Sequence, residues 1–296
     1  MKQVYPGRYH PATLLELIAR EGVTLSHCVP SILHMLLKAP ESQTVDLSGW
    51  KVIIGGSALP QGLAQAALDR GIDVFAAYGL SETCPLLTIA DVSDGKGDDN
   101  LALRCATGKP APLVELRVVD ENMNDIPHDG KSTGEIVVRA PWMTAGYVKN
   151  AQATAALFQG GYLHTGDVGR MDGFGTLQIT DRIKDIIKSG GEWISSLELE
   201  NITSRLNGVG EVAAIGIPDE RWGERPMLLV VRSAEAESNI TGDEILTEIR
   251  SHVDSGRLSK WAVPERIEFV DCIDKTSVGK LDKKTLRARY GSGEPL

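Results

Sequence analysis

The chain has 296 residues, a formal net charge of −9 and an apolar fraction of 42%. This composition is typical of an ordinary globular protein long enough for two hydrophobic cores. The acidic balance argues against nucleic acid as the main partner. No apolar run approaches the roughly 20 residues of a membrane span, and the first residues lack the apolar core of a signal peptide. The scattered cysteines predict reduced thiols in a cytoplasmic protein, with neither a zinc site nor disulfides; they are Cys28, Cys84, Cys105 and Cys272.

Residues 1–100 alternate helical and strand patterns, which indicates an α/β layer with a parallel sheet. Pro11 and Gly22 are suited to begin and end an amphipathic helix. Further helices are expected at 32–37 and 61–70, strands at 23–28, 50–54 and 72–77, and a polar loop at 91–100. Ligands in such sheets bind beyond the carboxyl ends of strands, so the segments that follow the last two strands are candidate site walls.

From residue 101 to 180 the pattern changes to short strands separated by turns, which predicts an antiparallel, barrel-like subdomain. After residue 181 an α+β pattern follows, with capping boxes at Ser195–Glu198 and Thr241–Glu244 and strands at 211–217, 226–231 and 266–270. The expected fold is therefore α/β and α+β. Part of a large domain occupies 1–180, and a small carboxy-terminal domain occupies 181–296.

The stretch between the two parts, residues 179–195, alternates cations with apolar residues. It then reaches Gly190 and Gly191, where the backbone can approach a ligand closely or adopt positive φ. From the residues alone, a surface hairpin with a glycine turn is an equally good interpretation.

The two strand ends in the α/β layer carry candidate binding segments. In GGSALP (55–60), small residues let a flat ring or a phosphate lie against backbone amides, although a plain strand–helix turn is the favoured interpretation of the segment alone. In YGLSET (78–83), Tyr78 can stack on adenine, Ser81 and Thr83 can donate to phosphate, and Glu82 can bind Mg²⁺. A helix start capped by Ser81 and Glu82 is the alternative.

Two later segments carry a carboxylate and a cation. In GYLHTGDVG (161–169), Asp167 suits a bidentate contact with two ribose hydroxyls, or an Asx turn after Gly166; His164 is given no catalytic role. Lys280 follows Gly279 before a basic helix. Its ammonium can neutralise charge on a carboxylate and a phosphate as they react, while a solvated basic tail is the alternative.

Together these motifs resemble the adenylate-forming acyl-CoA synthetase superfamily, and EWIS (192–195) is similar to the version in medium- and long-chain fatty-acid–CoA ligases. The resemblance implies that Tyr78 contacts adenine, Thr83 the α-phosphate and Glu82 Mg²⁺. It assigns the ribose to Asp167 and Arg182. The residues that it associates with ATP, AMP or CoA are Gly55, Ser57, Ala58, Tyr78, Gly79, Asp167, Ile179, Arg182, Gly190 and Gly191.

The resemblance also implies a two-step ligation of a fatty acid with CoA. Lys280 and Mg²⁺ stabilise the charge that develops as the acyl-adenylate forms. The small domain then rotates about Lys184, the hinge, and brings the Gly190–Gly191 segment to the approach of the CoA thiol. Asp274 replaces a proline of the family pattern, a departure expected to loosen the loop that carries Lys280.

The resemblance covers about the last half of a complete synthetase, and the loop that binds the β- and γ-phosphates of ATP is absent from this sequence. We therefore expect little ATP-driven ligation by the chain alone, and self-association through an exposed edge of the large-domain part. Two alternatives stay open. One is a non-catalytic nucleotide- or CoA-binding module, and the other is a sibling ligase that acts on aryl acids or loads a carrier protein.

Overall fold

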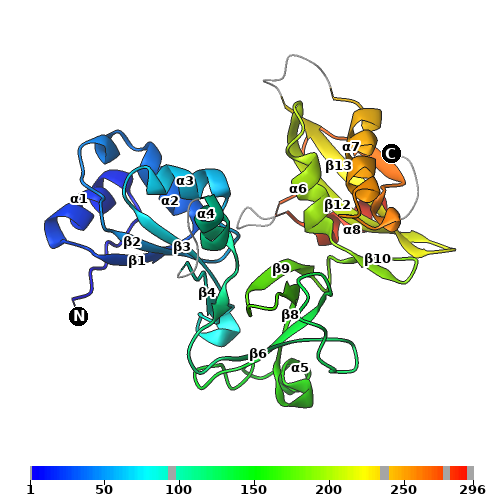
Figure 1. The fold of residues 1–296 in the computed structure, drawn as a ribbon, viewed down its shortest axis with the longest axis horizontal. Coiled ribbons are helices and arrows are strands. Elements are labelled where there is room, and N and C mark those ends of the chain that lie inside the picture. Colours follow the sequence, from blue (N-terminus) through cyan, green and yellow to red (C-terminus); the bar gives the residue numbers. More distant parts are fainter. Residues whose placement is uncertain (1, 93–97, 234–239, 276–280, 292–296) are drawn as a thin grey trace. The chain divides into compact units, whose positions relative to one another are not determined.

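The computed structural model describes residues 2–92, 98–233, 240–275 and 281–291 (Figure 1). The chain separates into two compact units. The N-terminal unit contains residues 1–165 and 169–179, and the C-terminal unit contains residues 166–168 and 180–296.

The N-terminal unit begins with a five-stranded sheet in the order β1-β2-β3-β4-β5. Strands β1 (Leu25–Cys28), β2 (Lys51–Ile54) and β3 (Asp73–Tyr78) are parallel, as the alternating pattern predicts. Strand β4 (Thr88–Ile89) pairs antiparallel with β3, and β5 (Lys109–Pro110) pairs antiparallel with β4. The helical elements of this layer are α1 (Pro11–Glu21), α2 (Pro30–Lys38), η1 (Pro40–Gln43), α3 (Gln61–Leu68), η2 (Ser81–Thr83) and α4 (Asp98–Cys105). The fully buried side chains of the core include Leu15, Leu33, Val52, Ile54 and Val74.

Local signals predict the start and end of α1 correctly. Pro11 is its first residue, and Gly22 ends it with φ of 60°, a left-handed conformation that glycine adopts without strain. The predicted loop at 91–100 is partly wrong, because α4 begins at Asp98. Tertiary contacts hold α4: Arg104 forms a 2.7 Å ion pair with Asp73 and lies 4.9 Å from the centre of the Phe75 ring.

The rest of the N-terminal unit is built on a four-stranded sheet in the order β6-β7-β8-β9. Its strands are β6 (Glu115–Val119), β7 (Gly134–Arg139), β8 (Leu163–Met171) and β9 (Leu177–Arg182), and β6 and β7 are antiparallel. Within the described residues this is an open sheet and not a closed barrel. Short helices α5 (Ala151–Leu157) and η3 (Gln159–Gly161) accompany it. Asn150 caps α5 by accepting a 3.0 Å hydrogen bond from the Ala153 N–H.

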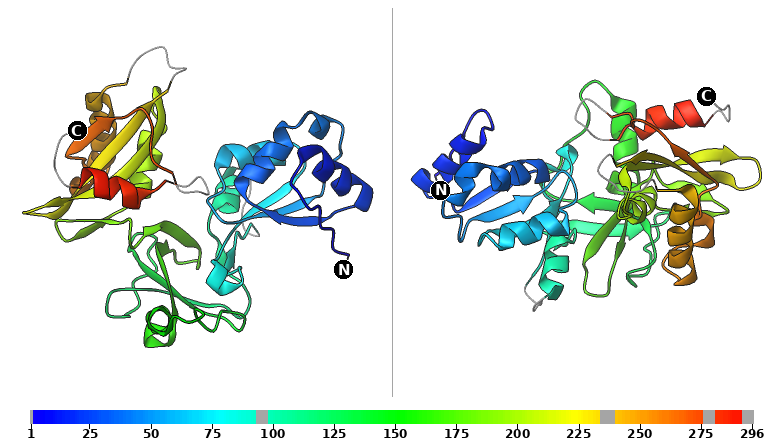
Figure 2. Two further views of the ribbon diagram at one scale, coloured as in Figure 1. Left: turned by 180° about the vertical axis from the view of Figure 1, so that it is seen from behind. Right: turned by 90° about the horizontal axis from the view of Figure 1, so that it is seen from above.

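The C-terminal unit is an α+β fold whose sheet follows the order β11-β10-β13-β12, with β14 parallel to β13. Its elements are β10 (Ile187–Ser189), β11 (Glu192–Ile194), α6 (Ser196–Thr203), β12 (Val209–Asp219), β13 (Gly223–Arg232), α7 (Gly242–Asp254), η4 (Lys260–Ala262), β14 (Arg266–Phe269) and α8 (Lys283–Tyr290). Alternate strand residues point to opposite faces of a sheet. Val212 and Ala214 accordingly pack with α6 and α7, whereas Ala213 and Ile215 pack with α8. The right-hand view of Figure 2 shows α7 and α8 on opposite faces of this sheet.

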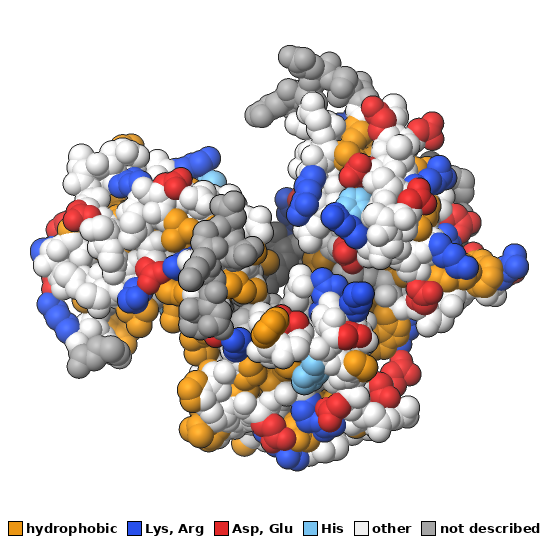
Figure 3. Space-filling model, in the orientation of Figure 1, with side chains coloured by type: hydrophobic (Ala, Val, Ile, Leu, Met, Phe, Trp, Pro, Cys, Tyr) orange, Lys and Arg blue, Asp and Glu red, His pale blue; other side chains and the backbone are white. Residues whose placement is uncertain are grey.

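The predicted caps of this unit are present. Ser195 Oγ accepts a 3.1 Å hydrogen bond from the Glu198 N–H at the start of α6. Thr241 and Glu244 bond reciprocally at the start of α7, which is a complete capping box. Across the described residues, every helix falls short of the length and apolar character that a membrane crossing requires. In the view of Figure 3, acidic and basic side chains are interspersed over the surface.

Candidate nucleotide site

The glycine pair of the crossover segment closes a hairpin between β10 and β11, in which Ser189 pairs with Glu192. Gly190 and Gly191 have φ of 60° and 83°, as a type I′ turn requires. A Cβ on Gly190 would lie 2.7 Å from the ring of Trp261, whereas a Cβ on Gly191 would meet no atom within 4 Å. The hairpin interpretation is therefore correct, and Gly190 is needed for packing against Trp261. A role for either glycine in CoA binding stays a prediction.

The two residues assigned to the ribose lie together in the C-terminal unit. Asp167, on β8, has a side chain only 6% exposed, and its Oδ1 lies 3.2 Å from Nε of Arg182, whose side chain is 47% exposed. The Ile183 N–H donates a 2.9 Å bond to the Gly166 carbonyl and joins the backbones beside the pair. Asp167 lies within strand β8. A buried carboxylate beside an accessible guanidinium can accept from and donate to a vicinal diol.

The YGLSET segment forms the end of β3 and the turn η2 in the N-terminal unit. Tyr78 is only 9% exposed and belongs to the apolar core below the turn. A side chain on Gly79 would collide with the Pro85 carbonyl, so glycine is required there by the chain itself. Thr83 is fully buried. Its hydroxyl accepts from the Leu80 N–H at 2.9 Å and lies 3.1 Å from the Leu80 and Pro85 carbonyls. Contacts of Tyr78 with adenine and of Thr83 with phosphate stay predictions.

Glu82 is the acidic residue of this turn. Its Oε1 accepts a 2.7 Å hydrogen bond from the Tyr147 phenol, and its backbone carbonyl accepts a 2.8 Å bond from the Thr144 N–H. The bond to the Glu82 carboxylate raises the pKa of Tyr147 above its ordinary value. A half-buried carboxylate offers Mg²⁺ one hard oxygen ligand. This fits an ion that takes its other ligands from substrate phosphates and water. Among the described residues, groups of three or more metal-ligating side chains are absent.

The GGSALP segment follows β2, and its small residues lie where the sequence predicts. Gly55 is buried, and a Cβ there would approach His27 Nε2 at 2.9 Å, while Ser57 and Ala58 are exposed. Ile179, on β9, is half-buried and donates its N–H to Thr107 Oγ1 at 3.2 Å.

The two remaining predicted residues belong to the C-terminal unit. Lys184 is exposed in the turn after Arg182, where the Asp185 and Ile186 N–H groups both donate to the Arg182 carbonyl. Lys280, predicted to be catalytic, lies outside the described residues.

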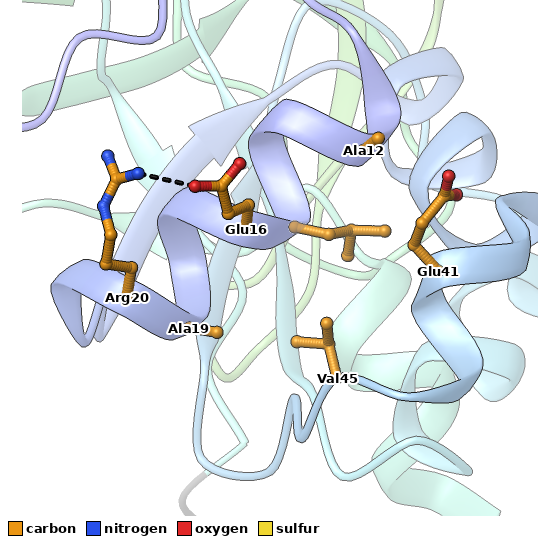
Figure 4. A pocket seen from close by; sticks show the side chains of 7 residues that line it. Ala12, Glu16, Ala19, Arg20, Glu41 and Val45 are labelled. Carbon is orange, nitrogen blue, oxygen red and sulfur yellow. Dashed lines mark hydrogen bonds and ion pairs between the residues drawn. The ribbon is translucent and has the colours of Figure 1, made fainter.

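A separate surface hollow lies between α1 and η1 (Figure 4). Its volume is about 680 Å³, and the Glu16–Arg20 ion pair lies along it. Its lining comes from residues 12–20, 41 and 45, apart in sequence from every predicted site residue. We assign no function to it.

Sequence reasoning missed Tyr147 and Trp261. Tyr147 is 65 residues from its partner Glu82, and Trp261 lies on η4 far from the glycine turn that it contacts. Neither position carries a local pattern that predicts these contacts.

Comparisons with known proteins agree with these motifs. Residues 1–148 match the family model of the AMP-binding enzymes, and residues 198–280 match that of the AMP-binding enzyme C-terminal domain. The chain is 39% identical to a long-chain-fatty-acid–CoA ligase of Thermus thermophilus, over 98% of this chain and 53% of that protein. It is 38% identical to a 3-methylmercaptopropionyl-CoA ligase of Ruegeria lacuscaerulensis, with the same coverage.

A solved structure gives the same result for the fold. ATP-bound MatB from Rhodopseudomonas palustris matches with a TM-score of 0.74 and 29% identity, over 95% of this chain and 53% of that one. The chain thus spans about half the length of the relatives it matches. The first family model alone covers half of the sequence, and the Thermus ligase is similar along nearly all of it. The chain therefore belongs to the AMP-binding, adenylate-forming enzyme family.

Proposed function

We propose that the protein acts in ATP-dependent ligation of a fatty acid to CoA. The observation that carries the proposal is the Asp167–Arg182 pair, which offers both acceptors and donors to a nucleoside diol. A long-chain-fatty-acid–CoA ligase among the relatives supports the substrate class.

The proposal assigns one chemical role to each site residue. Asp167 accepts hydrogen bonds from the two ribose hydroxyls, and Arg182 donates to the same sugar. Tyr78, Gly79 and the small residues Gly55, Ser57 and Ala58 line the adenine, and Ile179 packs beside the nucleotide. Thr83 contacts the α-phosphate by exchanging its bond to the Pro85 carbonyl for a phosphate oxygen.

The proposed reaction has two steps. In the first, the fatty-acid carboxylate attacks the α-phosphorus of ATP, and the bond to the leaving pyrophosphate breaks. The ammonium of Lys280 neutralises the charge that builds on the phosphate oxygens. Glu82 would hold Mg²⁺, which when bound supplies further charge neutralisation on the phosphates.

In the second step the CoA thiol attacks the acyl-adenylate carbonyl. The thioester forms, the thiol proton is lost and AMP leaves. We assign the change between steps to rotation about Lys184, which is exposed in the turn after Arg182. The same proposal places the Gly190–Gly191 turn along the approach of the CoA thiol.

A second candidate function is a nucleotide- or CoA-binding module without chemistry. The hydroxyl of Thr83, assigned to the α-phosphate in the ligase, is engaged by its own turn, which favours this candidate.

One set of measurements on residues 1–296 distinguishes the two candidate functions. AMP and CoA binding is measured by calorimetry, and CoA thioester formation is measured from supplied lauroyl-adenylate. A ligase binds AMP and makes the thioester, whereas a module binds AMP or CoA without acyl transfer. Asp167→Ala should weaken AMP binding, and the exposed Asp254→Asn serves as the matched control. Absence of both AMP and CoA binding by the wild-type chain would reject both candidates. A series of acids of increasing length, assayed with a complete enzyme that carries this sequence, then tests the fatty-acid assignment.

A further inference from the structure

Asp181 begins a buried network that the reaction described above does not use. Its side chain is in the interior, with 1% of the residue exposed, although its neighbour Arg182 is at the surface. Its Oδ1 accepts a 2.7 Å hydrogen bond from the Arg182 N–H. Its Oδ2 accepts from the Ser196 N–H at 2.6 Å and from the Ser196 hydroxyl at 2.7 Å.

The cation of this network is Lys283, the first residue of α8. Its side chain is 8% exposed, and its Nζ lies 2.7 Å from Ser196 Oγ and 2.7 Å from Glu200 Oε1. Glu200 Oε1 also accepts from the Ala214 N–H of β12 at 2.8 Å. The crossover residue Asp181, helices α6 and α8 and strand β12 are therefore joined by one buried set of polar contacts.

The hydrogen-bond directions in the network follow from its geometry. An ammonium only donates, so the Ser196 hydroxyl accepts from Lys283 and gives its single proton to Asp181. The hydroxyl thereby connects the carboxylate to a cation that it does not touch directly. A buried carboxylate is costly without compensating charge and hydrogen bonds. Lys283, acting through Ser196, supplies part of that compensation to Asp181.

The other carboxylate oxygen of Asp181 holds the residue that follows it in the chain. Oδ1 fixes the backbone N–H of Arg182, and the guanidinium of Arg182 lies 3.2 Å from Asp167. A continuous series of contacts thus runs from Lys283 through Ser196 and Asp181 to the pair assigned to the ribose.

We propose that Lys283 and Ser196 are positioning residues for recognition of the ribose diol. Neither touches the nucleotide; they hold Asp181 and so set the place of Arg182 beside Asp167. This inference rests on the proposed function, in which Asp167 and Arg182 contact the ribose.

The test compares AMP with 2′,3′-dideoxy-AMP, which lacks both ribose hydroxyls. Calorimetry on residues 1–296 gives the two dissociation constants, and their ratio measures recognition of the diol. Hydrogen bonds to charged groups imply a ratio of roughly 10 or more for the wild type. Ser196→Ala should reduce the ratio several-fold and leave the affinity for the dideoxy nucleotide unchanged, and Ser196→Thr should restore it. Ser204→Ala, at an exposed serine beside the same helix, is the control.

A second variant tests Lys283 itself without leaving the buried carboxylate of Glu200 unpaired, which could unfold the protein. Lys283→Met combined with Glu200→Gln removes one charge of each sign and keeps an acceptor for the Ala214 N–H. We expect the same reduced ratio in this double variant, while Glu200→Gln alone, which retains the cation, should keep the wild-type ratio.

The outcomes distinguish failure of the positioning role from failure of the ribose assignment. A folded Ser196→Ala or double variant that keeps the wild-type ratio overturns the positioning role. A parallel loss of affinity for both nucleotides also overturns it, because that is what a purely structural network produces. A wild-type chain that binds both nucleotides equally instead refutes the ribose assignment of the proposed function.

Discussion

The Tyr147 phenol donates a 2.7 Å hydrogen bond to Oε1 of Glu82, a residue 65 positions earlier in the chain. The Thr144 N–H holds the Glu82 backbone carbonyl at 2.8 Å, so the residue is fixed at its side chain and its main chain. The orientation of this carboxylate, which is assigned to Mg²⁺, is therefore set by a segment that carries no site motif of its own.

Tyr147→Phe removes this side-chain bond with little change in shape. The loss of a hydrogen bond to a charged group should raise the Mg²⁺ concentration needed for ATP binding by roughly tenfold. Titration of ATP binding against Mg²⁺ measures the effect, with Tyr5→Phe, at an 83% exposed tyrosine, as the control. An unchanged Mg²⁺ dependence would show that Tyr147 does not orient the ligand. Ultraviolet titration gives an independent check, because Glu82→Gln should return the raised pKa of Tyr147 toward its ordinary value.

Gly190→Ala introduces both a positive-φ strain and a contact with Trp261. The left-handed backbone costs about 1–2 kcal/mol for alanine, and overpacking costs about 1–3 kcal/mol in addition. Gly191→Ala has the backbone cost alone, since its Cβ would meet no atom within 4 Å. Urea denaturation should therefore rank the loss of unfolding free energy as Gly190→Ala above Gly191→Ala. Gly242→Ala, in the first turn of α7 with open space around it, is the control. Equal losses of unfolding free energy in Gly190→Ala and Gly191→Ala would mean that the Trp261 side chain moves away from the added methyl group at no cost.

The buried Glu200 predicts a specific dependence of stability on pH. Burial raises the pKa of this carboxyl group above its ordinary value, and the ammonium of Lys283 only partly opposes the shift. Between the ordinary and the raised pKa, the folded state binds more protons than the unfolded state. The contribution of Glu200 to stability is therefore fully present below that range and is lost as pH rises through it. Unfolding free energies measured from about pH 4 to pH 8 should fall for the wild type relative to Glu200→Gln, and then run parallel. A wild type that instead gains unfolding free energy relative to Glu200→Gln as pH rises would contradict the raised pKa.

Lys280→Ala separates the two proposed steps. In a complete enzyme that carries this sequence, acyl-adenylate formation should fall by roughly 100-fold or more, the effect of removing one transition-state donor. Thioester formation from supplied acyl-adenylate should be largely spared. ATP–pyrophosphate exchange and thioester assays measure the two steps, with the exposed Lys284→Ala as the control. Equal loss in both steps would refute a role confined to adenylation.

Local patterns were sufficient for much of the fold. The parallel order of β1, β2 and β3, the glycine stop of α1 and the caps at Ser195 and Thr241 all depend on neighbouring residues. Local patterns missed α4, which begins at Asp98 near the end of a predicted loop, because the contacts of Arg104 with Asp73 and Phe75 hold that helix.

The candidate site, like the fold, depends partly on local sequence patterns and partly on tertiary contacts. The sequence by itself determined which residue types stand at the strand ends and the crossover, and those motifs were enough to identify the family. Only the tertiary structure decided which side chains support them. Tyr147 reaches Glu82 across 65 residues, and Lys283 reaches Ser196 across 87. Such contacts form when distant segments pack, and no short-range periodicity or spacing encodes them.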